Sequence, residues 1–140
     1  MTATEHPGRA STGAARPVSL TVGQVARAAG VTANAVRHYE RYGVISGDRN
    51  SGNARRFTAD AICRIRLALA AQRVGITLRE SAAILAGIPP LSHDLALWAT
   101  AGEELVRIGR ARISELQATV NELATFGFLQ TDAAPDRRRP

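Results

Sequence analysis

The stretch LTVGQVARAAGVTANAVRHYERYGVISGDRNSGNARRF, residues 20–57, decides the fold of this chain. Its first half holds the signals for two short helices. Thr21 and Thr32 can each cap a helix N-terminus, while Gly30 and Gly43 can end the helices that follow. Two helices joined by a turn this short predict a helix-turn-helix. The two expected helices run to about Ala29 and to about Tyr42.

The second of these helices has a polar face and an apolar face. At ~100° per residue, its polar side chains fall within one sector of the helix surface and its apolar ones on the other side. Amide and guanidinium groups suit contact with base edges and phosphates in a DNA major groove. We therefore predict a DNA recognition helix, although short helical pairs with Gly between them also occur in unrelated helical proteins. The polar residues are Asn34, Arg37, His38 and Arg41, and the apolar ones are Ala35, Val36, Tyr39 and Tyr42.

A loop rich in Arg and Asn follows the two helices. Residues 44–45 predict a short buried strand, residues 47–53 supply turn chemistry, and residues 54–57 return toward the core. Such a hairpin is a wing, whose basic and small polar side chains can contact the sugar-phosphate backbone of DNA. A solvated hairpin whose charges only keep the protein soluble is the alternative. The candidate DNA contacts are Arg49, Ser51, Asn53, Arg55 and Arg56, together with Thr21 at the first helix cap.

Two more helices complete the expected DNA-binding domain, which covers residues 18–87. Thr58 or Asp60 can begin a third helix, which is apolar around most of its circumference. A fourth helix covers about residues 78–86. Cys63 shares its face of the third helix with apolar residues, so we expect a buried and inert thiol.

From about Ser92 to Leu129 the sequence predicts one long helix, and residues 88–129 form the expected dimerisation segment. Apolar residues step by three and four along two stripes that are displaced by one residue. At ~1.5 Å per residue the helix is roughly 50 Å long, and a single chain has nothing left to cover its apolar seam. We therefore expect an antiparallel coiled coil in a twofold homodimer. The candidate dimerisation residues are Trp98, Leu105, Ile108, Ile113, Leu116, Val120 and Leu123.

The run VGQVARAAGVTANAVRHYERYGVI resembles the N-terminal winged helix-turn-helix of MerR-type bacterial transcription regulators, and RNSGNARRF with AQRVGITL is similar to the SoxR branch. The resemblance covers about Leu20 to Leu129. It implies a homodimer that places recognition helices in the major groove of double-stranded DNA, with RNA polymerase as a further partner at the promoter. By this resemblance Arg37, Tyr39, Arg55 and Arg56 contact phosphates, while Asn34 and His38 are the candidates for base contacts.

The C-terminal stretch departs from the SoxR pattern. SoxR-type proteins follow the dimerisation helix with four cysteines that hold a [2Fe-2S] centre, whereas this chain has FGFLQTDAAPDRRRP. That stretch has no Cys or His to bind iron, so we expect no metal and no cofactor. An apolar small-molecule effector beside Trp98, Phe126 and Phe128 is one candidate partner, and simple packing of these rings against a partner subunit is the alternative.

Composition supports a small cytoplasmic protein. The chain has 140 residues, a net charge of +6 and 45% hydrophobic residues, as expected for one helical domain with an appendage. Its 18 basic residues are all Arg, which we attribute to GC-rich coding, so position and not abundance identifies candidate phosphate contacts. One Cys excludes an intramolecular disulfide framework, and no apolar run reaches the roughly 18 residues of a membrane span. We expect residues 1–17 and 130–140 to be disordered tails.

Together these patterns predict a mostly α protein, with a winged helix-turn-helix DNA-binding domain followed by a long dimerisation helix. The expected function is transcription regulation by a homodimer on a pseudo-palindromic promoter operator, and the family resemblance implies that the dimer distorts this DNA. One alternative is an architectural or excisionase-like protein that bends DNA without an effector, which would not require the long helix. An enzyme is not expected, because no paired carboxylates, activated nucleophile or phosphate-binding Gly loop occurs in a supporting context.

Overall fold

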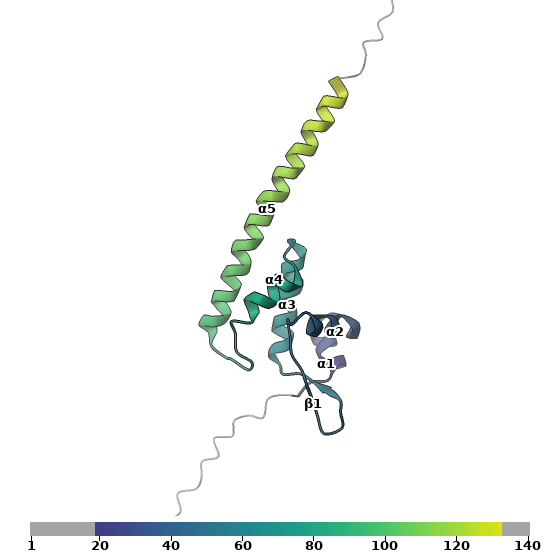
Figure 1. Cartoon of the computed structure of the whole chain (residues 1–140), viewed down its shortest axis with the longest axis vertical. Coiled ribbons are helices and arrows are strands. Elements are labelled where there is room, and N and C mark those ends of the chain that lie inside the picture. Colours follow the sequence, from purple (N-terminus) through teal and green to yellow (C-terminus); the bar gives the residue numbers. More distant parts are fainter. Residues whose placement is uncertain (1–18, 133–140) are drawn as a thin grey trace, which may run out of the picture.

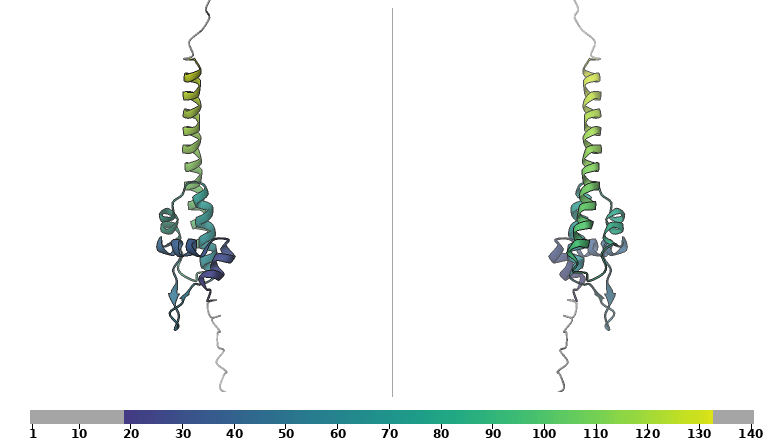
Figure 2. Two further views of the ribbon diagram at one scale, coloured as in Figure 1. Left: turned by 90° about the vertical axis from the view of Figure 1, so that its right-hand side faces the viewer. Right: turned by 90° about the vertical axis from the view of Figure 1, so that its left-hand side faces the viewer.

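The computed structural model describes residues 19–132, with side chains up to residue 127. Its elements are α1 (Val22–Ala29), α2 (Ala33–Arg41), β1 (Asp48–Arg49), β2 (Arg55–Arg56), α3 (Asp60–Arg73), α4 (Leu78–Leu85) and α5 (Leu95–Asp132). Helices α1 to α4 and the hairpin form one small unit, and α5 leaves this unit as a single long rod (Figure 1, Figure 2). The predicted mostly α fold is confirmed. Of the predicted tails, residues 1–17 and 133–140 lie outside the described residues, and residues 130–132 belong to α5.

Side-chain caps fix both helix starts in the helix-turn-helix. Thr21 Oγ1 accepts a hydrogen bond from the Gln24 amide at 3.1 Å, and Gln24 Oε1 accepts one from the Thr21 amide at 2.9 Å. Gly30 ends α1 with a φ of 72°, a left-handed conformation that favours glycine. Thr32 Oγ1 then accepts from the Ala35 amide at 3.1 Å and begins α2. The predicted helices and the turn between them are therefore confirmed, and local hydrogen bonds explain them.

The core lies around α3, between the helices that pack against it. Ile65 and Ala68 of α3 are fully buried, together with Val25 of α1, Val36 of α2 and Phe57 after the hairpin. Full burial of a side chain the size of Val or Ile contributes about 1.5–3 kcal/mol to folding. Because one face of α1 and one face of α2 supply this apolar surface, their other faces remain at the surface of the molecule.

The prediction that α3 is apolar around most of its circumference is wrong. Cys63, Arg66, Ala70 and Arg73 recur at intervals of three or four residues, and all four are exposed, so they form a solvent face. Cys63 is therefore an exposed thiol and not the buried one that we predicted. The physical reason is that Arg66 and Arg73 carry charges that stay in water, and Cys63 and Ala70 have little apolar area, so this face does not require cover.

A buried charge that the sequence did not reveal, Arg64, lies on the inner side of α3. The Arg64 guanidinium donates to the Ile88 carbonyl at 2.8 Å, pairs with Asp60 at 3.0 Å, and lies 5.4 Å from the centroid of the Trp98 ring. Burial alone would raise the pKa of the Asp60 carboxyl, but hydrogen bonds from Thr58 and Arg64 outweigh burial and lower this pKa below its ordinary value. Arg64 thus contacts both the segment after α4, through the Ile88 carbonyl, and the start of α5, through Trp98.

The first half of α5 packs against its own chain. Ala101 and Leu105 are buried, at 5% and 8% exposure, and Trp98 and Ile108 are partly buried against the same unit. We predicted Trp98, Leu105 and Ile108 as dimerisation residues; in this structure α3 and α4 of the same chain bury Leu105 and cover part of Trp98 and of Ile108. For the same reason the core does not end at residue 87.

Two contacts mark the place where α5 leaves the rest of the chain. A Cβ at Gly109 would lie 3.3 Å from Val74 Cγ2, so glycine permits the close approach of α5 to the end of α3. Arg112 donates to the Gly75 carbonyl at 2.9 Å and to Glu80 Oε1 at 2.5 Å. From Ile113 to Gly127, the last residue whose side chain is described, every residue of α5 is exposed.

The second apolar stripe of α5, which we call the seam, has no cover within the described chain. Its residues are between 51% and 65% exposed, and steps of seven, three and four residues place them along one line of the helix. Apart from Val106, which was not a predicted dimerisation residue, this row is the part of the predicted dimerisation surface that the structure leaves uncovered. The seam consists of Val106, Ile113, Leu116, Val120 and Leu123.

Candidate nucleic-acid interface

The polar face of α2 is exposed, as we predicted. Asn34, Arg37, His38 and Arg41 are all exposed, while Val36 on the opposite face is fully buried. Arg37 Nη1 donates to Asn34 Oδ1 at 3.2 Å, so the amide and the guanidinium lie side by side on the surface. Because a guanidinium has five N–H donors, this contact leaves others to bind a ligand.

Two tyrosines, Tyr39 in α2 and Tyr42 directly after it, were both predicted on the apolar face, and only Tyr39 is buried. Tyr39 is 4% exposed, its hydroxyl donates to Gln72 Oε1 at 3.2 Å, and burial raises the pKa of this hydroxyl. The Tyr39 ring therefore belongs to the core, and its hydroxyl bonds to Gln72 of α3. Tyr42 was expected to pack on the core, but α2 has already ended at this residue, and its 36% exposed ring contacts His38 and Arg79 instead.

The wing is an antiparallel hairpin, in which Asp48 lies opposite Arg56 and Arg49 lies opposite Arg55. The hairpin is confirmed, but the predicted strand at residues 44–45 is wrong. Val44 and Ile45 are buried within a bend, and β1 begins only at Asp48. Their apolar side chains fill the core, whereas strand pairing occurs in the polar part of the loop.

Asn50 organises the tip of the wing. Its Oδ1 accepts hydrogen bonds from the Gly52 amide at 3.0 Å and from the Ala54 amide at 2.9 Å. Asn53 has a φ of 63°, and its carbonyl accepts from Arg49 Nη1 at 3.2 Å. Asn side chains that bond nearby backbone shape a turn before any ligand binds. The exposed Ser51 is therefore presented on a loop of defined shape.

Arg55 links the wing to α2 through an ion pair. Its guanidinium forms an ion pair with the carboxylate of Glu40 in α2, and the two side chains are 35% and 19% exposed. Sequence reasoning missed Glu40, because helical periodicity does not show which loop returns to which helix. Arg56, in contrast, lies half-buried in β2 opposite Asp48.

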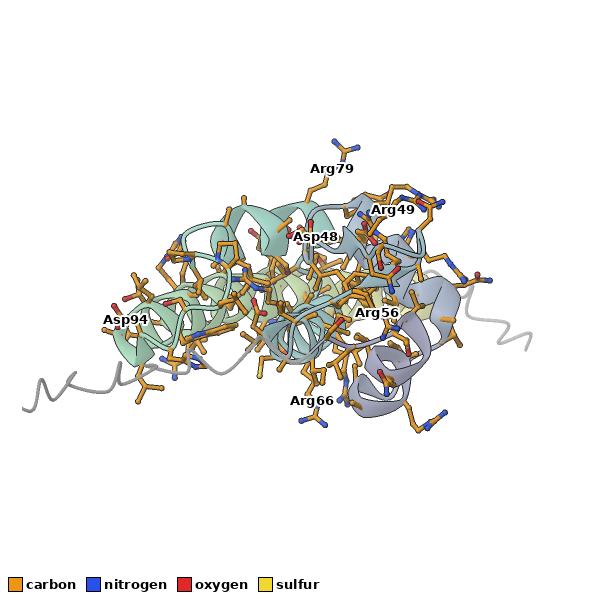
Figure 3. The ribbon with its side chains drawn as sticks, turned by 90° about the horizontal axis from the view of Figure 1, so that it is seen from below. Asp48, Arg49, Arg56, Arg66, Arg79 and Asp94 are labelled. Atoms are coloured by element: carbon orange, nitrogen blue, oxygen red, sulfur yellow. The ribbon has the colours of Figure 1, made fainter. Side chains whose placement is uncertain are left out.

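The two candidate DNA-contacting regions lie at one end of the molecule. In Figure 1 the wing and the helix-turn-helix are at the end opposite the free end of α5. Leu20 and Phe57 exchange backbone hydrogen bonds of 2.7 and 2.8 Å, which join the start of α1 to the base of the wing beside Thr21. Seen from this end, Arg49 and Arg79 project from one edge and Arg66 from the opposite edge (Figure 3).

The predicted effector site cannot form within one chain. Trp98 and Phe126 are 28 residues apart in the same helix, which at ~1.5 Å per residue separates them by roughly 42 Å. The side chain of Phe128 lies outside the described residues. Between residues 19 and 132, no group of three or more His, Cys, Asp or Glu side chains is placed to hold a metal ion. Nor is any helix in that part of the chain long and apolar enough to cross a membrane.

Known proteins resemble this chain in both sequence and structure. A family model described as MerR HTH family regulatory protein matches residues 20–88. A SoxR homolog from Chromobacterium violaceum, named as a transcriptional activator, is 34% identical over 64% of this chain, and the match spans 63% of that protein, which is less than two thirds of its length. The mercuric resistance operon regulatory protein of Pseudomonas fluorescens is 32% identical, over 75% of this chain and 74% of its own. A crystal structure of a MerR family transcriptional regulator from Listeria monocytogenes superposes with a TM-score of 0.54 and 26% identity, over 83% of this chain and 88% of that chain.

Proposed function

The chain belongs to the MerR family of helix-turn-helix regulatory proteins, and we propose that it is a transcriptional regulator that binds double-stranded DNA as a homodimer. The observation that carries this proposal is the pairing of the exposed polar face of α2 with the arginine-bearing wing at one end of the molecule (Figure 1). A helix with an exposed amide and guanidinium groups fits a major groove, and a hairpin beside it reaches the adjacent phosphates.

The proposed contacts divide into base contacts and backbone contacts. Asn34, in the first turn of α2, and His38, one turn later, are both exposed and are the proposed base contacts. The proposed backbone contacts surround them, because guanidinium groups pair with phosphates and small polar groups add neutral hydrogen bonds. The backbone set consists of Thr21, Arg37, Arg41, Arg49, Ser51, Asn53, Arg55 and Arg56.

The proposed occupant of the seam is a second copy of this chain. The exposed apolar line from Val106 to Leu123 takes one step of seven residues and then steps of three and four, the spacing of a coiled-coil contact. Antiparallel pairing about a twofold axis would cover both copies with the same residues, and it would place two α2 helices on two half-sites of a pseudo-palindrome. The homodimer also supplies what one chain lacks for an effector site, since Trp98 of one copy could then approach Phe126 of the other.

The proposed mode of regulation is deformation of promoter DNA. A rigid dimer that holds two half-sites imposes its own spacing on the duplex, and the cost depends on how easily the intervening DNA bends or twists. RNA polymerase at the same promoter is the proposed reader of this deformation. A regulator of this kind would act in the cytoplasm.

Selection of binding sites from a pool of random DNA duplexes tests the proposal, followed by measurement of affinity by fluorescence anisotropy. Asn34→Ala should lose ~1–3 kcal/mol of discrimination at one base pair in each half-site. Arg55→Ala should weaken binding to all sequences and reduce the slope of log affinity against log salt by about one.

Arg110→Ala is the matched control for these variants, because it removes an exposed arginine from α5, away from the wing. It should leave both discrimination and the salt slope unchanged. A wild-type protein that enriches no sequence, or Asn34→Ala and Arg55→Ala variants that bind the selected site as the wild type does, would contradict the proposed function.

A further inference from the structure

An exposed aromatic contact joins the recognition helix to α4. The centroid of the His38 ring lies 4.7 Å from that of Tyr42, with 62° between the ring planes. The Arg79 guanidinium, which comes from α4, lies 5.7 Å from the centroid of the same Tyr42 ring. We call these three residues, His38, Tyr42 and Arg79, the His38 cluster.

The position of Tyr42 limits the motion of the His38 side chain. The two residues are four apart, so their side chains meet on the surface of α2. An edge-to-face arrangement is one that aromatic rings prefer. An exposed histidine without such a neighbour samples several rotamers, and it would have to lose that freedom when it binds a base. The Tyr42 ring therefore holds the imidazole before DNA arrives.

Arg79 supports this arrangement from a second helix. Its side chain is exposed, and in the described part of the chain it forms no ion pair with a carboxylate. A guanidinium near an aromatic ring is attracted by the electrons of the ring face. Because buried Leu78 and Leu85 fix α4 in the core, the Tyr42 ring is held from outside α2 as well as from within it.

We propose that Tyr42 and Arg79 are positioning residues that hold the His38 imidazole for the recognition of one base pair. This inference rests on the proposed DNA-binding function and assigns a share of its specificity to Arg79, which lies outside the helix-turn-helix. Neither residue was a candidate in the sequence, since Tyr42 was expected in the core and Arg79 belongs to a different helix.

The test uses the full-length protein and the operator selected by the wild type. The His38→Ala variant first identifies the base pair at which discrimination depends on His38. At that base pair Tyr42→Ala should lower discrimination about threefold to tenfold, whereas Tyr42→Phe should retain it because the ring remains. Discrimination at the base pair that depends on Asn34 should be the same in the His38→Ala, Tyr42→Ala and Tyr42→Phe variants.

Arg79→Ala should cause a smaller loss at the same base pair, and that loss should vanish when Tyr42 is already Ala, because both residues act through one ring. Arg73→Ala is the matched control, since Arg73 is exposed but contacts no aromatic ring in the described chain. In the protein without DNA, the His38 Hε1 resonance should shift in Tyr42→Ala by NMR and change little in Tyr42→Phe.

Three results would overturn the inference while leaving DNA binding intact. His38→Ala with unchanged discrimination at every position would remove its premise. Tyr42→Ala with full discrimination at the His38 base pair would show that the ring does not position the imidazole. Equal weakening by Tyr42→Ala at all positions would show a structural role only. If the wild type selects no sequence, the proposed function is wrong, and this inference falls with it.

Discussion

The two halves of α5 have apolar stripes of similar spacing, but they differ in what covers them. In the first half, Ala101 and Leu105 are at most 8% exposed, because α3 and α4 of the same chain pack on them. In the second half, Leu116 and Leu123 are 58% and 65% exposed. Helical periodicity therefore identifies a face that needs cover, but it does not identify the molecule that provides the cover.

The seam is displaced by one residue from the covered apolar stripe in the first half of α5. This displacement accompanies the change from cover by the same chain to no cover within the described chain. A helix that packs first on its own chain and then on another can use neighbouring faces for the two contacts, and a displacement of one residue turns a stripe by ~100° around α5. Gly109 and Arg112 make the last contacts with the α3–α4 turn, next to the first seam residues.

Truncation should have the largest effect. A chain that ends at Gly87 loses Trp98, Ala101 and Leu105, and with them roughly 5 kcal/mol or more of folding free energy, which is as much as many small domains possess. A chain that ends at Arg112 keeps these contacts and should fold as a monomer. Urea denaturation followed by circular dichroism measures both. Equal stability of the two truncated chains would show that the first half of α5 does not belong to the core.

Single substitutions in the two stripes should separate folding from association. Leu105→Ala should lower the free energy of unfolding by about 2–4 kcal/mol at every protein concentration, since it leaves a cavity in the core. Val120→Ala, in the seam, should change the stability of the monomer by less than about 0.5 kcal/mol. Both are measured in the Leu116→Glu background, which removes association. A large effect of Val120→Ala in this monomer would contradict the division.

Two of the glycines within α5, Gly102 and Gly109, offer a smaller effect. Nothing lies within 4 Å of a Cβ added at Gly102, so Gly102→Ala should stabilise the monomer by about 1 kcal/mol through helix propensity. Gly109→Ala should gain less, because Val74 must move to admit the new methyl group. Thermal unfolding of the two variants compares them directly. The account of Gly109 fails if its substitution stabilises the protein as much as that of Gly102.

The smallest predicted effect concerns pH. A hydrogen bond from the Thr77 amide, more than any other group, lowers the pKa of the Glu80 carboxyl below its ordinary value of 4.5, and Arg112 adds to this effect. A carboxyl whose pKa is lowered by folding stabilises the protein above its unfolded pKa, and that contribution is lost as pH falls through the folded value. The unfolding free energies of the wild type and of Glu80→Gln should therefore converge below about pH 4.5.

Urea denaturation between pH 7 and pH 3 measures this convergence. Glu122→Gln, on the exposed half of α5, is the control for the loss of one carboxylate. A constant difference between the wild type and Glu80→Gln over this range would show that the contact of α5 with the turn before α4 depends on something other than this carboxylate.

The helix-turn-helix could be predicted from the sequence because its signals are local. Thr21 and Thr32 bond amides three residues away, and Gly30 adopts the left-handed conformation at a helix end. The exposed polar sector of α2 followed from periodicity in the same way. None of these features depends on which distant part of the chain packs nearby.

The features that the sequence did not reveal depend on contacts between distant residues. Arg64 binds a carbonyl 24 residues away, and Arg55 pairs with Glu40 through the return of the wing. Cys63 and Tyr42 were placed in the core by helical periodicity, although the helices that pack nearby leave both at the surface. Helical periodicity does not reveal these contacts, because they depend on how distant helices and the wing pack against one another.

The mass of the protein in solution tests the division of α5 most directly. Sedimentation equilibrium at micromolar concentration should give about twice the chain mass of 14.9 kDa for the wild type and 14.9 kDa for Leu116→Glu, with the far-ultraviolet spectrum of a folded protein in both. A monomeric wild type, or a Leu116→Glu variant that remains a dimer, would show that the seam is not where two copies of this chain meet.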